Sequence, residues 1–258
     1  MRVKCTVVTT SQRHYPVWFV ASLVVMSSLV IAFNAGATVL PTTYTTPVSH
    51  LSKQVGWQQP QQEARLQSAQ QALSNDEYHL SYRLLEPMAR QGNDRAQYQL
   101  AMLYDSSRNL ESAAAKAVYW YKKAAHQGHQ DAQHNLAVAY ANGNGVEQNI
   151  GKAMYWWQRA AAAGQVDAQY NLGIIYATGK GGVERNLPRA AKWWRQAAIA
   201  GDAMAQYNLA ALYANGINSV RHYCEAARWW EKSAANGFSQ ANIALQKIKL
   251  KQDYHSCW

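Results

Sequence analysis

A repeat of about 36 residues constrains the fold of this chain more than any other feature of its sequence. Alignment of the chain with itself brings four Ala-Gln pairs into register, at steps of 36, 36 and 37 residues. The pairs begin at Ala96, Ala132, Ala168 and Ala205. A period of this size is typical of a solenoid, in which each unit buries its apolar face only by stacking on its neighbours.

Glycines and aromatic pairs follow the same register. Five glycines keep these steps and add a last one of 36 residues: Gly92, Gly128, Gly164, Gly201 and Gly237. Four aromatic pairs begin at Trp120, Trp156, Trp193 and Trp229. The step of 37 comes from one loop, where Gly179 to Val183 replaces Gly143 to Val146 and has one residue more. A single insertion therefore explains the irregular step.

Each unit is predicted to contain two helices. In the third unit, one stripe of a helix ends near Ala177, before Gly179; its residues are Ala168, Leu172, Ile175 and Tyr176. After a glycine-rich loop, Asn149 or Asn186 can cap a second helix, and Pro188 fits its first turn. The unit is therefore an αα-hairpin.

Large rings and small alanines share one face of the second helix. In the second unit this face contains Ala153, Trp156, Trp157, Ala160 and Ala161, and the helix ends at Gly164. Alanine lets two antiparallel helices approach closely, so the Trp pairs are interpreted as core and not as a stacking platform for sugars or bases.

The composition agrees with a helical fold. Of 258 residues only 16% are charged, which is too few for a disordered chain or a long coiled coil. Ten Trp and sixteen Tyr stand against three Phe, and alanine pairs recur, unlike the Val/Ile-rich composition of a β-sandwich or parallel sheet. With 25 Lys and Arg against 15 Asp and Glu, the net charge is +10.

Residues 1–37 are predicted to be a signal peptide. Three basic residues accompany an uncharged stretch from Val17 to Phe33, and Ala35 to Ala37 offers small side chains for cleavage after Ala37. The alternative is a retained anchor, because the apolar stretch reads on to Leu40 and approaches the ~20 residues that span a bilayer. We expect a periplasmic or secreted protein, membrane-anchored only if the segment is retained. Without residues 1–37 the net charge is +7.

The remaining chain divides into three parts. Residues 38–61 are rich in Thr, Gln, Ser and Pro and are predicted to be a flexible leader. Residues 62–252 form the predicted solenoid, and residues 253–258 form a C-terminal tail.

The motif positions of the third unit resemble the Sel-1-like repeat, a relative of the tetratricopeptide repeat. They are Asp167 to Gly173, Tyr176, Gly179, Gly182-Val183, Ala190, Trp193-Trp194, Ala197-Ala198 and Gly201. The resemblance covers residues 80–245 and implies an all-α, right-handed α-solenoid of about four stacked antiparallel helix hairpins. The first and fourth loops depart from it, with Ser107 and Asn109 or Asn218 and Ser219 at motif positions.

Atypical sequences flank the four regular units. Residues 82–92 resemble a degenerate second helix and residues 62–73 its partner, while residues 239–251 resemble a last first-type helix with Lys and Gln on its free face. A solenoid needs such end caps to cover its terminal units.

Signatures of catalysis are missing from the sequence. It contains neither a family-type nucleophile signature nor a phosphate-binding loop, and Gly179 to Gly182 is interpreted as a turn between helices. His126, His129 and His134 lack the spacing of metal ligands on one helix face. We therefore predict no catalytic residue, no metal and no cofactor.

Tetratricopeptide-type stacking implies a concave groove along the first helices of the units. Its predicted partner-binding residues are Tyr98, Gln99, His134, Asn135, Tyr170, Asn171, Tyr207 and Asn208, and its predicted apolar base is Met102, Val138, Ile174 and Ala211. An aromatic residue followed by an amide suits an extended peptide, because amides pair with its backbone and rings cover its side chains. The alternative is that these residues hold adjacent helices together.

Two classes of function stay open. The first is a non-enzymatic adaptor or scaffold of the cell envelope that binds a protein or extended peptide. The second is an envelope enzyme of the β-lactam-binding or hydrolysing type, whose cysteine-rich relatives have a cysteine pair in each repeat that units one to three lack. Binding of anionic polymers or lipid headgroups by the +7 chain is a third possibility. Nucleic acid is not expected outside the cytoplasm, and the partner and the oligomeric state are not predicted.

A disulfide is predicted between Cys224 and Cys257. The second helix of the fourth unit is expected to start near Tyr223, which places Cys224 in its first turn. The last helix returns over a similar length, so the tail emerges level with Cys224. Signal-peptide cleavage removes Cys5 and leaves an even pair in an oxidising compartment.

A zinc site is the alternative at the same place. His222 and His255 lie two residues before the two cysteines, and two His with two Cys suffice for tetrahedral zinc. Oxidation competes for the thiolates outside the cytoplasm, which favours the disulfide.

Overall fold

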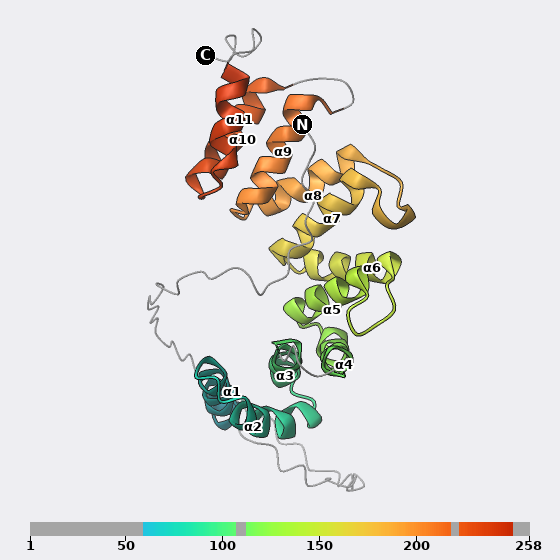
Figure 1. Ribbon diagram of the computed structural model, residues 1–258, viewed down its shortest axis with the longest axis vertical. Coiled ribbons are helices and arrows are strands. Elements are labelled where there is room, and N and C mark those ends of the chain that lie inside the picture. The colour runs from blue at the N-terminus through green and yellow to red at the C-terminus, as the bar shows by residue number, and fades with distance from the viewer. Residues whose placement is uncertain (1–58, 107–111, 218–221, 250–258) are drawn as a thin grey trace, which may run out of the picture.

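The computed structural model describes residues 59–106, 112–217 and 222–249 of the chain (Figure 1). In these ranges it contains eleven α-helices, which stack in chain order from α1 and α2 at one end to α10 and α11 at the other. The predicted all-α solenoid is confirmed. The helices are α1 (Gln59–Ser74), α2 (Tyr78–Arg90), α3 (Asp94–Ser106), α4 (Ala113–His126), α5 (Gln130–Asn142), α6 (Ile150–Ala162), α7 (Val166–Thr178), α8 (Leu187–Ile199), α9 (Ala203–Asn215), α10 (Tyr223–Ala235) and α11 (Gln240–Lys249).

Two kinds of helix alternate along the stack. We call the odd-numbered helices, α1 to α11, the A helices and the even-numbered ones, α2 to α10, the B helices. The four regular hairpins pair α3 with α4, α5 with α6, α7 with α8 and α9 with α10. The hairpin of α1 and α2 and the single helix α11 lie at the two ends, where the sequence predicts atypical caps.

Asparagines at the end of two loops begin the B helices as predicted. The Lys152 amide donates to Asn149 Oδ1 at 2.8 Å, and the Arg189 amide donates to Asn186 Oδ1 at 2.9 Å. The one-residue insertion of the third loop lies in a short 3-10 turn, Lys180–Gly182. The departing loop residues of the first and fourth units, Ser107, Asn109, Asn218 and Ser219, lie outside the described residues.

Tryptophan and alanine form the core, as the sequence predicts. Trp157 and Trp194 are fully buried, and the five face residues predicted for the second unit are all buried on α6. Trp194 Nε1 donates to the Tyr170 carbonyl at 3.1 Å, whereas Trp157 Nε1 has no partner among the described residues. Trp194 reaches that carbonyl because Gly173 has no side chain: a Cβ there would lie 2.3 Å from the indole.

The glutamine of each Ala-Gln pair fastens one hairpin to the next. Its Nε2 donates to a carbonyl in the last turn of the preceding B helix, where carbonyls have no partner within the helix. The four bonds join Gln97 to Ala89 (2.9 Å), Gln133 to Ala125 (3.0 Å), Gln169 to Ala161 (3.3 Å) and Gln206 to Ala198 (2.9 Å). The alanine of each pair is fully buried. The most regular motif of the sequence therefore marks the joint between repeats.

Candidate partner-binding pocket

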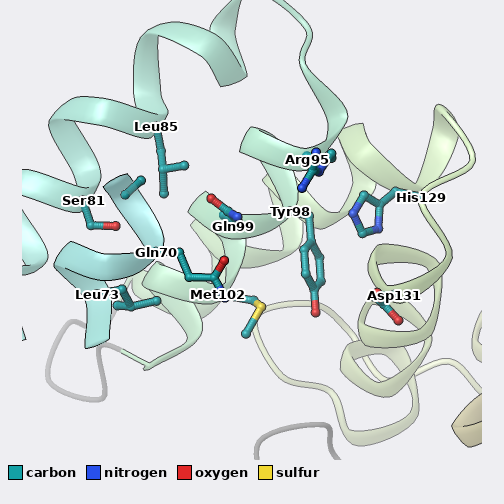
Figure 2. Close-up of a pocket in the computed structure, with 11 residues that line it drawn as sticks. Gln70, Leu73, Ser81, Leu85, Arg95, Tyr98, Gln99, Met102, His129 and Asp131 are labelled. Atoms are coloured by element: carbon teal, nitrogen blue, oxygen red, sulfur yellow. The ribbon is translucent and has the colours of Figure 1, made fainter. Parts of the chain in front are cut away.

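A pocket of about 230 Å³ opens between α1, α3 and the start of α5 (Figure 2). Its apolar wall comes from three helices: Ala69 and Leu73 of α1, Leu85 of α2 and Met102 of α3. Met102 is 37% exposed, which is unusual for a large apolar side chain in this chain. The pocket is therefore an apolar hollow open to solvent at the A-helix side of the first repeats.

Two polar atoms in the pocket wall lack partners. Ser81 Oγ and Gln99 Oε1 are buried and accept or donate no hydrogen bond among the described residues. Ser81 is fully buried as a residue, and Gln99 lies beside Met102 on α3 (Figure 2). Buried polar groups are nearly always paired in folded proteins, so these two atoms are available to a bound molecule or to water.

Tyr98 forms the side of the pocket that faces α5. Its ring stacks on the imidazole of His129, with centroids 4.4 Å apart and planes inclined by 26° (Figure 2). Burial raises the pKa of the Tyr98 hydroxyl, and the nearby Asp131 carboxylate raises it further. Tyr98 therefore stays a neutral donor at physiological pH.

His129 lines the pocket and caps α5. Its Nδ1 accepts a hydrogen bond from the Ala132 amide at 3.4 Å. Burial lowers the pKa of His129 and outweighs the opposing effects of Asp131 and Asp94. The neutral imidazole is thus favoured, which agrees with an unprotonated Nδ1 acting as the cap.

Polar side chains hold α1 against α3 at the rim. Arg95 forms an ion pair with Glu63, and Asn93 Nδ2 donates to Gln62 Oε1 at 2.9 Å. Asp131, in contrast, belongs to none of the ion pairs found among the described residues. The charged group of the pocket that forms no ion pair is therefore a carboxylate.

The structure separates the eight predicted groove residues into two groups. Tyr98 and Gln99 line the pocket, and Tyr207 is partly exposed beside Phe238, with ring centroids 5.1 Å apart. The other five are buried: His134, Asn135, Tyr170, Asn171 and Asn208. A buried side chain does not reach a docked partner, and for three of the five, Asn135, Tyr170 and Asn208, hydrogen bonds between helices support the alternative that they hold adjacent helices together.

Contacts of the buried residues show how they join helices. Asn208 Nδ2 of α9 donates to the Tyr170 hydroxyl of α7 at 3.5 Å, and Asn135 Nδ2 of α5 donates to the Tyr121 hydroxyl of α4 at 3.2 Å. The predicted apolar base divides in the same way. Met102 is exposed, while its equivalents Val138, Ile174 and Ala211 are buried.

Several pocket residues were not predicted. Leu73, Gln70 and Ala69 come from the degenerate hairpin, where no regular motif indicates which positions face α3. The position of His129 could have been predicted from the repeat. It is equivalent to Asn93, Gln165 and Asp202, and the side chains of all four residues cap an A helix.

The histidine cluster does not form a metal site in the part of the chain that the structure describes. No group of three or more His, Cys, Asp or Glu there is placed to hold a metal ion. His126 packs on Trp156 with ring centroids 5.0 Å apart, and His134 is fully buried. His129, the third member, stacks on Tyr98, so the three histidines have different surroundings.

The predicted cysteine pair is described only at one end. Cys224 lies in the first turn of α10, which begins at Tyr223 as expected. Cys257 and His255 lie outside the described residues, so the disulfide and its zinc alternative stay predictions.

Comparison with known proteins gives one family. The model of the Sel1 repeat matches the chain four times in succession, at residues 94–129, 130–165, 166–202 and 203–238. No curated protein matches this chain in sequence.

Solved structures agree with that family. The chain is 29% identical to c5321, a protective antigen present in uropathogenic Escherichia coli strains that displays an SLR fold, over 74% of this chain and with a TM-score of 0.68. It spans only 41% of that antigen's length. A Sel1 repeat protein from Oxalobacter formigenes is 25% identical, with 70% of this chain and 74% of that one covered and a TM-score of 0.64.

Sel1 repeat proteins are generally helical scaffolds for protein interactions, typically with protein partners, and are generally non-enzymatic. The four matches span more than half of the chain, and their boundaries coincide with the A and B hairpins of the structure. This chain therefore belongs to the Sel1 repeat family.

Proposed function

We propose that this protein is a non-enzymatic scaffold that binds an extended segment of a partner protein at the A-helix side of its first repeats. One apolar side chain of that segment enters the pocket between α1, α3 and α5. The observation that supports this proposal is the pocket itself, which combines an open apolar wall with two buried polar atoms that have no partner among the described residues.

The size of the pocket favours a side chain over a small molecule. Sites that enclose whole ligands usually measure ~300–1,000 Å³. A volume of about 230 Å³ falls below that range and suits one large apolar side chain with part of its backbone. The remainder of the segment would then lie on the exposed surface outside the pocket.

The polar atoms fit the backbone of such a segment. Gln99 Oε1 accepts an N–H, Ser81 Oγ accepts or donates, and the exposed Gln70 amide does both at the rim. A peptide backbone supplies one N–H donor and one C=O acceptor at nearly every residue, whereas a purely apolar ligand would leave these polar atoms of the pocket unpaired.

A displayed library of random peptides tests this proposal. Peptides selected on the full chain are measured against wild type and against Met102→Trp, in which an indole fills the open side of the pocket. We expect the selected peptides to share one large apolar residue, and Met102→Trp to weaken binding about tenfold to a hundredfold, since one buried apolar side chain contributes ~1.5–3 kcal/mol.

The matched control is Ile243→Trp, which puts the same indole on α11 at another exposed apolar position. It should leave binding unchanged. If no peptide is selected, or if both variants bind as the wild type does, this pocket is not the binding site.

We also propose that the scaffold acts outside the cytoplasm, on the evidence of the basic and apolar segment in residues 1–37. That segment lies outside the described residues, and among the described helices none is both long and apolar enough to span a membrane. Intact-mass analysis of protein from an envelope fraction is the test. A mature chain that starts at Thr38 supports cleavage, whereas a mass that includes residues 1–37 supports an anchor.

A further inference from the structure

The exposed side of three consecutive B helices is basic. α4, α6 and α8 together contain eight Lys and Arg residues and no Asp or Glu, and all eight are exposed. We call these residues the basic stripe: Lys116, Lys122, Lys123, Lys152, Arg159, Arg189, Lys192 and Arg195.

The positions of the stripe repeat from helix to helix. Lys116, Lys152 and Arg189 occupy one position of the repeat, in the first turn of their helices. A cation in the first turn opposes the helix dipole, so helix stability alone does not explain three of them in register. The recurrence points to a property of the surface rather than of each helix.

The charges of the stripe are not neutralised within the chain. None of the ion pairs among the described residues includes a member of the stripe. Their close neighbours are rings instead: Lys116, Lys152 and Arg189 lie 5.6, 5.5 and 5.6 Å from the ring centroids of Tyr104, Tyr140 and Tyr176. A ring orients a cation but leaves its positive charge in place.

The end helices differ from the three central ones. On α10 the equivalent positions hold Glu225, Arg228, Glu231 and Lys232, and Arg228 pairs with Glu225 at 3.1 Å. On α2, Arg90 pairs with Glu86 at 2.6 Å. Both end helices thus contain acidic residues among their cations, whereas α4, α6 and α8 contain none.

The three central helices form one continuous surface. His126 of α4 packs edge-on against Trp156 of α6, and Trp193 of α8 packs against the core cluster that contains Trp156. Between the cations, Tyr119 and Tyr155 are 52% and 51% exposed at equivalent positions. The surface therefore presents cations together with accessible rings.

We propose that the basic stripe docks an acidic, flexible segment of a second protein. Charge complementarity selects an anionic partner, and the exposed tyrosines add apolar contact for its side chains. The helix axes turn from one repeat to the next (Figure 1), so a flat bilayer would meet only part of the stripe, whereas a flexible polypeptide can follow it. Together with the pocket, this surface would let one chain hold two partners.

Poly-L-glutamate is the probe for this surface. Its binding to the full chain is measured by fluorescence anisotropy at low and moderate salt, beside vesicles of phosphatidylglycerol and phosphatidylcholine. The stripe variant is Lys122→Glu, Lys123→Glu and Lys192→Glu. Its matched control, Arg83→Glu, Lys247→Glu and Lys249→Glu, changes the net charge equally at exposed positions outside the stripe.

We expect the wild type to bind poly-L-glutamate with an affinity that falls as salt rises. The stripe variant should bind at least about tenfold more weakly, and the control less than about threefold, because near contacts dominate over distant charge. Equal losses in both variants would mean that net charge alone acts. Binding to the vesicles without binding to poly-L-glutamate would assign the stripe to a membrane. Either result overturns the proposal.

A second set of variants guards against misfolding. Glutamine replaces glutamate at the same six positions, and the helical circular dichroism of each variant is compared with that of the wild type. The weaker binding should again be specific to the stripe positions. If the neutral stripe variant folds and binds poly-L-glutamate as tightly as its control, the proposal is wrong.

Discussion

Tyr98 and Tyr170 occupy the same repeat position, yet one borders an open pocket and the other is completely buried. Tyr98 stacks on His129 and lines a hollow whose other wall is the degenerate cap helix α1, with Ala69 and Leu73. Tyr170 lies between regular repeats, and its hydroxyl accepts a hydrogen bond from Asn208 of α9. The neighbouring A helix, and not the residue itself, therefore decides whether a position is available for binding.

The largest difference in stability between the two regions is expected when each tyrosine is replaced by alanine. Tyr170→Ala should lower the free energy of unfolding by about 3–5 kcal/mol, because a fully buried ring leaves a cavity. Tyr98→Ala should cost less than half as much, since its ring already borders open space. Urea unfolding followed by circular dichroism measures both. Equal losses would contradict the comparison.

Gly173 is expected to show the next largest effect. Gly173→Ala should destabilise the chain by about 1–3 kcal/mol, because the added Cβ overlaps the buried Trp194 indole and outweighs the ~1 kcal/mol gain in helix propensity. The readout is the unfolding midpoint together with tryptophan fluorescence.

Gly151→Ala is the matched control on α6. Its Cβ would meet only Asn149 Oδ1 at 3.4 Å, an ordinary contact at an exposed position. It should be neutral or stabilise by up to about 1 kcal/mol. A Gly173 variant as stable as this control would show that the third repeat is packed more loosely than its geometry indicates.

The glutamine joints should behave alike in both regions. Gln97 and Gln206 are buried, and each donates to a carbonyl at 2.9 Å. Each also accepts a second bond from a side chain, Gln127 at 2.7 Å or Asn236 at 3.0 Å. Replacing either by Ala should cost about 1–2 kcal/mol, because the joint loses two hydrogen bonds: the carbonyl keeps only the N–H of Gly92 or Gly201, and the side chain of Gln127 or Asn236 loses its acceptor. A much smaller loss of stability for Gln97→Ala than for Gln206→Ala would mean that the joint beside the pocket is looser than the joint between regular repeats.

The smallest effect is expected from pH at the pocket rim. Burial holds the pKa of His129 below its ordinary value of 6.5, so the folded chain disfavours protonation there. Its stabilising contribution is complete above pH 6.5 and is lost progressively as pH falls toward the lowered folded pKa. His129→Asn keeps a cap like that of Asn93 but does not titrate.

Thermal unfolding between pH 5 and pH 7.5, in wild type and in His129→Asn, isolates this effect from the other histidines. The difference in melting temperature between the two proteins should change with pH in favour of the variant at low pH. A difference that stays constant across this range would exclude a role for His129 protonation in stability.

Much of the fold was predictable from local pattern. The stripe that includes Leu172 and Tyr176 indicates a helix, and the loop asparagines indicate where the next helix begins. The Trp and Ala face of α6 indicates which side of that helix is buried. These are properties of one hairpin, and the 36-residue period copies them along the chain. The use of the Ala-Gln pair was less visible, because its partner carbonyl lies eight residues earlier in another helix.

The repeat pattern alone predicts the solenoid and the A-helix positions on its partner side, including Tyr98, Gln99 and Met102. Which of those positions stay open depends on how neighbouring helices pack against each other. Between regular repeats, His134 and Asn171 are buried by the neighbouring helices. At α3 the neighbour is a degenerate cap, which leaves a pocket. Exposure is a property of how two helices fit together, so the repeat sequence of either one alone does not contain it.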